Sequence, residues 1–235
     1  MNSGHRAPLA APGRWIVLAA LMLSACAPAT PATSLTAQVV PVYGTAAAQP
    51  WLIKLYDCGA TQSAVLSEVN DPQSAAVVLQ LGQPRDPLIP AFQVGQETLE
   101  LWTNAQNPTP GLNAAQARQL FSGQIVNWKS VDGEDAPVNV WVYAADDDLQ
   151  QVFETALMDS RPVTSLARLA SSPREMAQAI ANDRNAIGIM SGSLALTLAI
   201  AGGHSVFSSE PIPVLAITPS EPQGTVRDLL GCMQK

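Results

Sequence analysis

The sequence contains few of the residues that enzyme and metal sites need. It has two histidines and three cysteines among 235 residues, and aromatic residues make up 5%. We find no Walker-type phosphate loop, no G-x-G-x-x-G after a strand, no G-x-S-x-G elbow and no Cys/His metal spacing. His204 has no carboxylate nearby in the sequence that could orient it for a Ser–His pair. We therefore expect no enzyme activity, no metal centre and no cofactor.

Basic residues are too sparse for a nucleic-acid surface. After Arg6 and Arg14 are set aside with the first 26 residues, ten basic residues face nineteen acidic ones, a net charge of −9. No cluster of lysine or arginine is present that could attract a phosphate backbone or an anionic membrane. Nucleic acid is therefore excluded as an expected partner.

Long apolar runs are also absent, because no stretch reaches eighteen uninterrupted apolar residues. The apolar stretch 15–23 follows two arginines, as in a signal peptide, and leads to the sequence LSAC that ends at Cys26. LSAC matches a bacterial lipobox, whose cysteine receives lipid; the alternative is an ordinary signal peptide with a chance cysteine. We expect residues 1–26 to be a lipoprotein signal peptide and residues 27–36, rich in Pro, Ala and Thr, to be a tether. The mature protein would be extracytoplasmic, anchored by lipid to a bacterial membrane.

The two remaining cysteines are an even pair in an oxidising compartment. Cys58 lies near the mature N-terminus and Cys232 lies three residues from the C-terminus. A disulfide between them would close a loop of about 175 residues, worth on the order of 5 kcal/mol in the chain-entropy model. Two buried free thiols are the alternative. We favour the disulfide because it would join the two chain ends in one lobe.

Apolar periodicity after residue 37 predicts strands that alternate with helices. We expect strands at 38–42, 75–81, 97–103, 138–143, 186–190 and 212–217, and helices at 46–56, 61–69, 113–123, 146–157, 172–182, 193–200 and 226–233. Asn113 and Gln116 form a capping box at one of these helix starts. Such alternation is typical of α/β layers with mainly parallel strands.

Three segments resemble a known family. FSGQIVNW (121–128), followed by an acidic-glycine turn and a Val-rich strand, resembles the substrate-binding lipoproteins of phosphate ABC importers. Residues 171–190 resemble the helix that precedes an "AIGY" strand in that family, and residues 211–234 resemble its return to the first lobe. The resemblance implies an α/β, two-lobed type II periplasmic-binding-protein-like fold with mainly parallel sheets.

The resemblance also implies a domain organisation and a function. Residues 37–95 and 204–235 would form lobe I, and residues 96–203 would form lobe II. The implied function is that of a solute-binding protein, which closes on a small molecule and delivers it to an ABC permease. An oxyanion is one candidate for that molecule. The alternative is a cell-surface lipoprotein that uses the fold as a structural or interaction module without transport.

In such folds the ligand lies between the lobes, where strand carboxyl ends meet helix N-termini. In lobe I, Gly44, Thr45 and Ala46 take the position of the family's first phosphate-contacting turn; the alternative is a plain strand-to-helix turn capped by Thr45. Arg85, in the following loop, is a candidate anion clamp or else a solvated surface residue. These four residues are the lobe I candidates.

The candidate contacts in lobe II are Tyr143, Asp146, Asp147 and Asp148. On the family's pattern, the three aspartates replace a Gly-Ser-Gly phosphate loop and Leu149 replaces its threonine. A unit anion about 6 Å from one carboxylate is repelled by about 3 kcal/mol at an effective dielectric constant of about 20. The aspartates would cap a helix, or else contact a cationic ligand. The matching segments thus support the fold. The aspartates that replace the phosphate loop argue against phosphate as the ligand.

Overall fold

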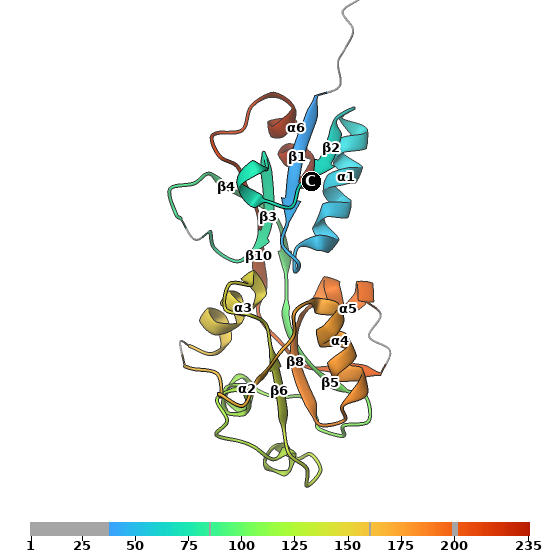
Figure 1. The fold of residues 1–235 in the computed structure, drawn as a ribbon, viewed down its shortest axis with the longest axis vertical. Coiled ribbons are helices and arrows are strands. Elements are labelled where there is room, and N and C mark those ends of the chain that lie inside the picture. Colours follow the sequence, from blue (N-terminus) through green and yellow to red (C-terminus); the bar gives the residue numbers. More distant parts are fainter. Residues whose placement is uncertain (1–37, 85, 160, 199–201) are drawn as a thin grey trace, which may run out of the picture. The chain divides into compact units, whose positions relative to one another are not determined.

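The computed structural model describes residues 38–235 except for 85, 160 and 199–201 (Figure 1). The expected signal peptide, the tether, Cys26 and Arg85 lie outside the described residues. Within the part of the chain that is described, no helix has the length and apolarity needed to cross a membrane.

The first sheet has the strand order β2-β1-β3-β10-β4. Its strands are β1 (Val39–Gly44), β2 (Val65–Glu68), β3 (Val77–Leu81), β4 (Ala91–Glu97) and β10 (Ile212–Ile217). The first three pair in parallel, whereas β10 runs antiparallel to both β3 and β4. Buried alternate residues of β1 and β3 form the core beneath α1 (Gln49–Thr61), which packs beside α6 (Gly224–Met233). Residues from both ends of the described chain therefore build this sheet.

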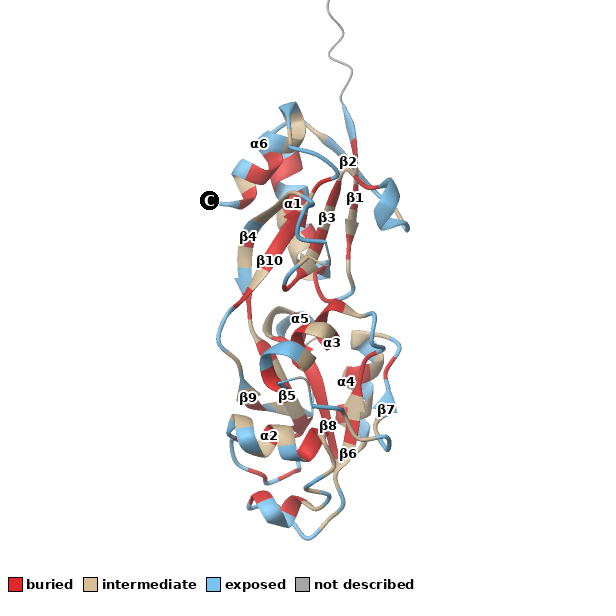
Figure 2. Cartoon of the chain, turned by 90° about the vertical axis from the view of Figure 1, so that its left-hand side faces the viewer, coloured by how far each residue is buried: buried red, intermediate tan, exposed pale blue. Residues whose placement is uncertain are grey.

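The second sheet repeats this pattern in the order β7-β6-β8-β5-β9. Its strands are β5 (Leu99–Asn104), β6 (Asn139–Val142), β7 (Arg168–Leu169), β8 (Ala186–Ser191) and β9 (Gly203–Ser208). Its helices are α2 (Ala114–Phe121), α3 (Asp148–Val152), which continues as a π-helical turn at Phe153–Leu157, α4 (Pro173–Asn182) and α5 (Gly192–Leu198). In both sheets the second strand in the order, β1 or β6, has a parallel neighbour on each side, and the central strand, β3 or β8, pairs antiparallel with the strand that follows it in the order. All six residues of β8 are buried, as Figure 2 shows by colour.

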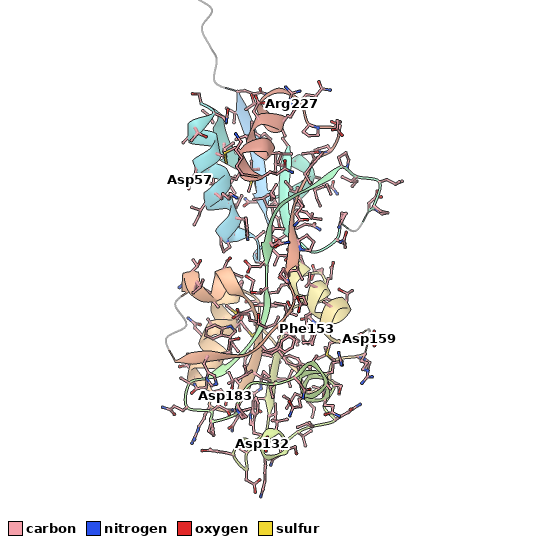
Figure 3. The ribbon with its side chains drawn as sticks, turned by 180° about the vertical axis from the view of Figure 1, so that it is seen from behind. Asp57, Asp132, Phe153, Asp159, Asp183 and Arg227 are labelled. Carbon is pink, nitrogen blue, oxygen red and sulfur yellow. A yellow bond between two sulfur atoms is a disulfide. The ribbon has the colours of Figure 1, made fainter. Side chains whose placement is uncertain are left out.

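Several local predictions are confirmed. The side chain of Asn113 accepts a hydrogen bond from the backbone of Gln116 and the reciprocal bond is present, so the capping box starts α2. Phe121, from the FSGQIVNW segment, packs against Phe153 with 4.7 Å between ring centroids; Phe153 is labelled in Figure 3. Trp128, which is 1% exposed, donates from Nε1 to the carbonyl of Asn185. The segment that carries the resemblance thus contributes to the core of the second sheet.

The predicted disulfide between Cys58 and Cys232 is present and joins α1 to α6. Its two Cα atoms lie 5.8 Å apart, within the usual range for disulfides. Helices from the two ends of the described chain are therefore covalently linked over one sheet.

Other local predictions are wrong. The helix expected at 61–69 is instead the end of α1, a turn at Ser63 with φ of 54°, and strand β2. β2 lies at the sheet edge with mostly exposed residues, so it lacks the alternation that identifies a strand. The strands β4, β7 and β9 were not predicted either. Because β9 pairs with β5, the chain returns to the first sheet after residue 208, later than the predicted boundary at 204. Both sheets also contain antiparallel pairs, so the pairing is mixed.

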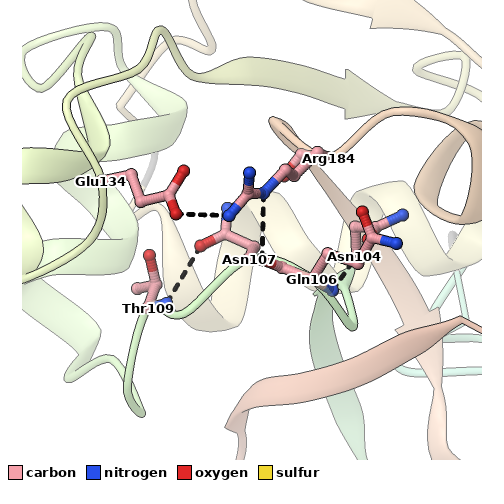
Figure 4. A network of polar contacts seen from close by, with 6 residues as sticks. All are labelled: Asn104, Gln106, Asn107, Thr109, Glu134 and Arg184. Carbon is pink, nitrogen blue, oxygen red and sulfur yellow. Dashed lines mark hydrogen bonds and ion pairs between the residues drawn. The ribbon is translucent and has the colours of Figure 1, made fainter.

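A polar network ties the loop after β5 to the turn before β8 (Figure 4). Arg184 forms an ion pair with Glu134, and its Nε donates to the carbonyl of Gln106. Asn107 donates to the carbonyl of Arg184 and accepts from the backbone N–H of Thr109. These bonds explain how polar residues lie buried in this loop.

Candidate functional site

The carboxylate of Asp148 links the two sheets through hydrogen bonds. Its Oδ2 accepts from the hydroxyl of Thr45 at 2.6 Å and from the backbone N–H of Leu81 at 2.7 Å. Thr45 directly follows β1, Leu81 is the last residue of β3, and Asp148 opens α3 beyond β6. The side chain is 8% exposed. A carboxylate from the second sheet therefore fills the space between two donors of the first.

The neighbouring aspartate has a different role. Asp147 Oδ1 accepts from the backbone N–H groups of Leu149 and Gln150, so Asp147 is the N-cap of α3. Gln150 folds back to accept from the backbone N–H of Tyr143 at 3.1 Å and is 2% exposed. These bonds hold the loop from 143 to 150 in one conformation, which aims Asp148 at the first sheet. The predicted capping function is present, but it belongs to Asp147.

The loop that contains Asp147 and Asp148 is electrostatically unfavourable for a further negative charge. Burial raises the pKa of Asp148 above its ordinary value, against the lowering effect of its hydrogen bonds to Leu81 and Thr45. Burial, followed by the charge of Asp148, raises the pKa of Asp147 to about 6. Burial and then the charge of Asp147 raise the pKa of the Tyr143 hydroxyl. Neither Asp147 nor Asp148 forms a salt bridge with any residue that the structure describes.

A second buried carboxylate joins the sheets where the chain crosses between them. Glu97, the last residue of β4, is 6% exposed. Its Oε1 accepts from the backbone N–H groups of Thr98 and Ser193, and its Oε2 accepts from Trp51 Nε1. Trp51 belongs to α1 and Ser193 to α5, so this carboxylate contacts helices of both sheets. Glu97 was not predicted from the sequence, because a single glutamate at a strand end carries no pattern.

A groove of about 480 Å³ lies between α1, the start of α4 and α5. Its apolar lining includes Ile53 from α1 and Leu194 from α5, and Arg174 at the start of α4 is its charged lining residue. Gln49 and Ser172 add polar groups. This groove does not include Asp148, which lines a separate pocket of about 390 Å³ together with Leu81, Gly82 and Val152.

The structure brings some of the sequence-predicted residues together and separates others. Thr45 and Asp148 meet, but they bond to each other. Ala46 lines the groove, and Gly44 packs closely under α1, because a Cβ there would lie 2.7 Å from a methyl group of Leu52. Tyr143 is buried with its hydroxyl 3.6 Å from Met190 Sδ, and Asp146 is exposed. Whether these residues contact a ligand stays a prediction.

Comparison with known proteins identifies the fold. A family model described as a PBP superfamily domain matches residues 90–226, more than half of the chain. The structure resembles a phosphate-bound protein from Clostridium perfringens that is assigned as a phosphate ABC transporter substrate-binding protein, with a TM-score of 0.67, 13% identity and coverage of 83% of this chain and 93% of that one. It also resembles an ABC-type phosphate transport receptor from Vibrio cholerae, with a TM-score of 0.64, 14% identity and the same coverage.

The fold is not confined to transport receptors. The CcmR regulatory domain from Synechocystis, in complex with 2-PG, matches with a TM-score of 0.59, 11% identity and coverage of 83% of this chain and 95% of that one. Identities this low establish a shared fold and leave the ligand open. The predicted type II periplasmic-binding-protein-like class is confirmed.

Proposed function

Because the chain belongs to the PBP superfamily, we propose that it is a lipid-anchored extracytoplasmic solute-binding protein of an ABC importer, with a ligand other than inorganic phosphate. The likeness in fold to phosphate transport receptors supports the solute-binding role. The lipobox that ends at Cys26 supports the lipid anchor. Replacement of Cys26 by serine, together with fatty-acid labelling of cells, would test this anchor.

One observation supports the proposal that phosphate is not the ligand. The Thr45 hydroxyl and the Leu81 N–H, which would suit an anion, donate to Asp148. A phosphate at these donors would have to displace a bonded carboxylate and approach Asp147 as well. At an effective dielectric constant of about 20, each nearby carboxylate would repel a unit negative charge by about 3 kcal/mol at about 6 Å. The chain therefore disfavours the ligand of its structural relatives.

The groove beside α1 is the place that we propose for the solute. Its volume of about 480 Å³ falls in the range of sites for small organic molecules. Ile53 and Leu194 offer apolar surface, and the guanidinium of Arg174 offers one positive charge. A small organic acid with an apolar part matches this lining.

A thermal-shift screen of the chain without its first 26 residues tests this proposal. The compounds would be phosphate, other oxyanions, amino acids, apolar organic acids and divalent metals. A bound compound at a hundred times its Kd adds about 2.7 kcal/mol of stability. We expect stabilisation by an organic acid, lost in Arg174→Ala and kept in the control Arg227→Ala, which lies on α6 outside the groove. Stabilisation by phosphate would contradict the proposal.

A second candidate is the interaction module without transport. Its support is that Asp148 and Glu97 join the two sheets through hydrogen bonds that need no solute. A screen in which no compound stabilises the protein would favour this candidate, as would the absence of permease and ATPase genes beside the gene for this chain.

A further inference from the structure

Two donors on the first sheet form a small binding site for an anion. The hydroxyl of Thr45 and the backbone N–H of Leu81 both point to one atom, Asp148 Oδ2, at 2.6 and 2.7 Å. Leu81 is 2% exposed, so its N–H has no access to bulk water as a substitute partner. A donor pair of this kind requires an acceptor, and an anionic oxygen is the strongest one.

The acceptor reaches these donors from the other sheet. Asp148 is 103 residues from Thr45 and 67 residues from Leu81 in sequence. The N-cap of Asp147 and the backbone bond of Gln150 to Tyr143 fix the loop that presents it. Asp148 adds little to the local structure of α3, since Leu149 N–H is also bound by Asp147. The position of its carboxylate is therefore best explained by the donors that it meets.

We propose that Thr45 and Leu81 form an anion site whose resident ligand is the carboxylate of Asp148, and that this internal ligand both joins the two sheets and keeps other anions, phosphate included, away from these two donors. The site has the chemistry for a small monovalent carboxylate or oxyanion. The inference rests on the proposed function only for the rejection of phosphate; the internal ligand requires neither a solute nor a permease.

Replacing the internal ligand by a free one tests the site. In Asp148→Gly the side-chain carboxylate is gone, and formate supplies the same chemical group with the same charge. Formate is also small enough to enter beside Asp147, and because it restores the original charge, the repulsion is no greater than in the native chain. We expect the Tm of Asp148→Gly to fall below that of the native chain in sodium chloride, and to recover partly in about 100 mM sodium formate at equal ionic strength.

Two controls separate a filled site from a general salt effect. The native chain should have the same Tm in both salts, since its site is filled. Asp146→Gly, which removes one charge from the same loop but leaves Asp148 in place, should also show no preference for formate. Equal Tm values of Asp148→Gly in formate and chloride would overturn the proposal. Failure of every solute in the thermal-shift screen would leave this result unaffected.

The native chain offers a second measurement if Asp148→Gly does not fold. The amide of Leu81 should exchange with deuterium as slowly as that of Leu79 in the middle of the same strand, because Asp148 holds it. Exchange of Leu81 at least tenfold faster than Leu79, at the rate of the following loop, would overturn the proposal.

Discussion

The two sheets share a pattern of parallel and antiparallel pairing, but the turns that follow β1 in the first sheet and β6 in the second differ in chemistry. After β1, the turn Gly44-Thr45-Ala46 presents a hydroxyl donor. After β6, the turn presents Asp146, Asp147 and Asp148, which are acceptors when ionised. Two turns that both present donors could bind one anion between them. Here one turn presents a donor and the other an acceptor, so the two turns form a hydrogen bond with each other. We therefore propose that this difference disfavours phosphate in this chain, although the fold is shared with phosphate transport receptors.

The sheets also differ in what stabilises them. The helices over the first sheet are joined by the disulfide Cys58–Cys232. The second sheet has no cysteine, and its core includes the Phe121–Phe153 pair. We therefore expect the stability of the first sheet to depend on redox conditions and that of the second to depend on packing.

Removal of the disulfide should have the largest effect. The bond spans 174 residues of sequence, so the double variant Cys58→Ala and Cys232→Ala should lose about 2–5 kcal/mol of unfolding free energy. Urea unfolding measures the loss. A reducing agent should destabilise the native chain by a similar amount and leave the double variant unchanged. Faster hydrogen exchange in α2 than in α1 and α6 after reduction would contradict the assignment of the disulfide to the first sheet.

Loss of the donor at Thr45 should have the next largest effect. Thr45→Val keeps the shape of the side chain but leaves Asp148 with one donor fewer from the first sheet. A hydrogen bond to a charged group is worth about 1.5–3 kcal/mol, so we expect a loss in that range in urea unfolding at neutral pH. Thr45→Ser keeps the hydroxyl and should recover most of the stability. Equal stability of the valine and serine variants would show that the bond contributes nothing.

Removal of the charge at Asp147 should have a smaller, pH-dependent effect. The pKa of Asp147 is raised from 3.8 to about 6 in the folded protein, so the folded state binds this proton more tightly than the unfolded state does. Its contribution to stability is therefore full below about pH 4 and is lost as pH rises through about 6. Asp147→Asn keeps a capping oxygen and cannot ionise. We expect it to be more stable than the native chain by about 1 kcal/mol at pH 7.5 and similar to it at pH 4.

Urea unfolding of both proteins at the two pH values checks this prediction. Asp57→Asn serves as the control, since Asp57 is exposed on α1, outside this loop, whereas the charge of Asp146 itself contributes to the raised pKa of Asp147. An identical difference between Asp147→Asn and the native chain at both pH values would contradict the raised pKa.

The sequence allowed prediction of those features that depend on local patterns or on residue counts. The capping box at Asn113, the apolar strand β8 and the Cys58–Cys232 bond belong to this group. Edge strands such as β2 and β7 escaped prediction, because exposed strands lack an apolar alternation. They form through pairing with a neighbour that is distant in sequence.

Some residues of the candidate site were predicted from the sequence, but their hydrogen bonds were not. Thr45 and Asp148 were both candidates, yet the bond between them crosses 103 residues and depends on how the two sheets meet. Leu81 and Glu97 were missed, since one contributes a backbone N–H and the other is a lone glutamate. No residue type or spacing signals either role.

A calorimetric titration of phosphate into the chain without its first 26 residues, at pH 7.5, tests the central claim most directly. Asp148 already accepts from the Thr45 hydroxyl and the Leu81 N–H, and Asp147 adds a second carboxylate beside it. We predict no saturable heat of binding up to about 1 mM phosphate. A saturable isotherm with a Kd in the micromolar range would contradict the account.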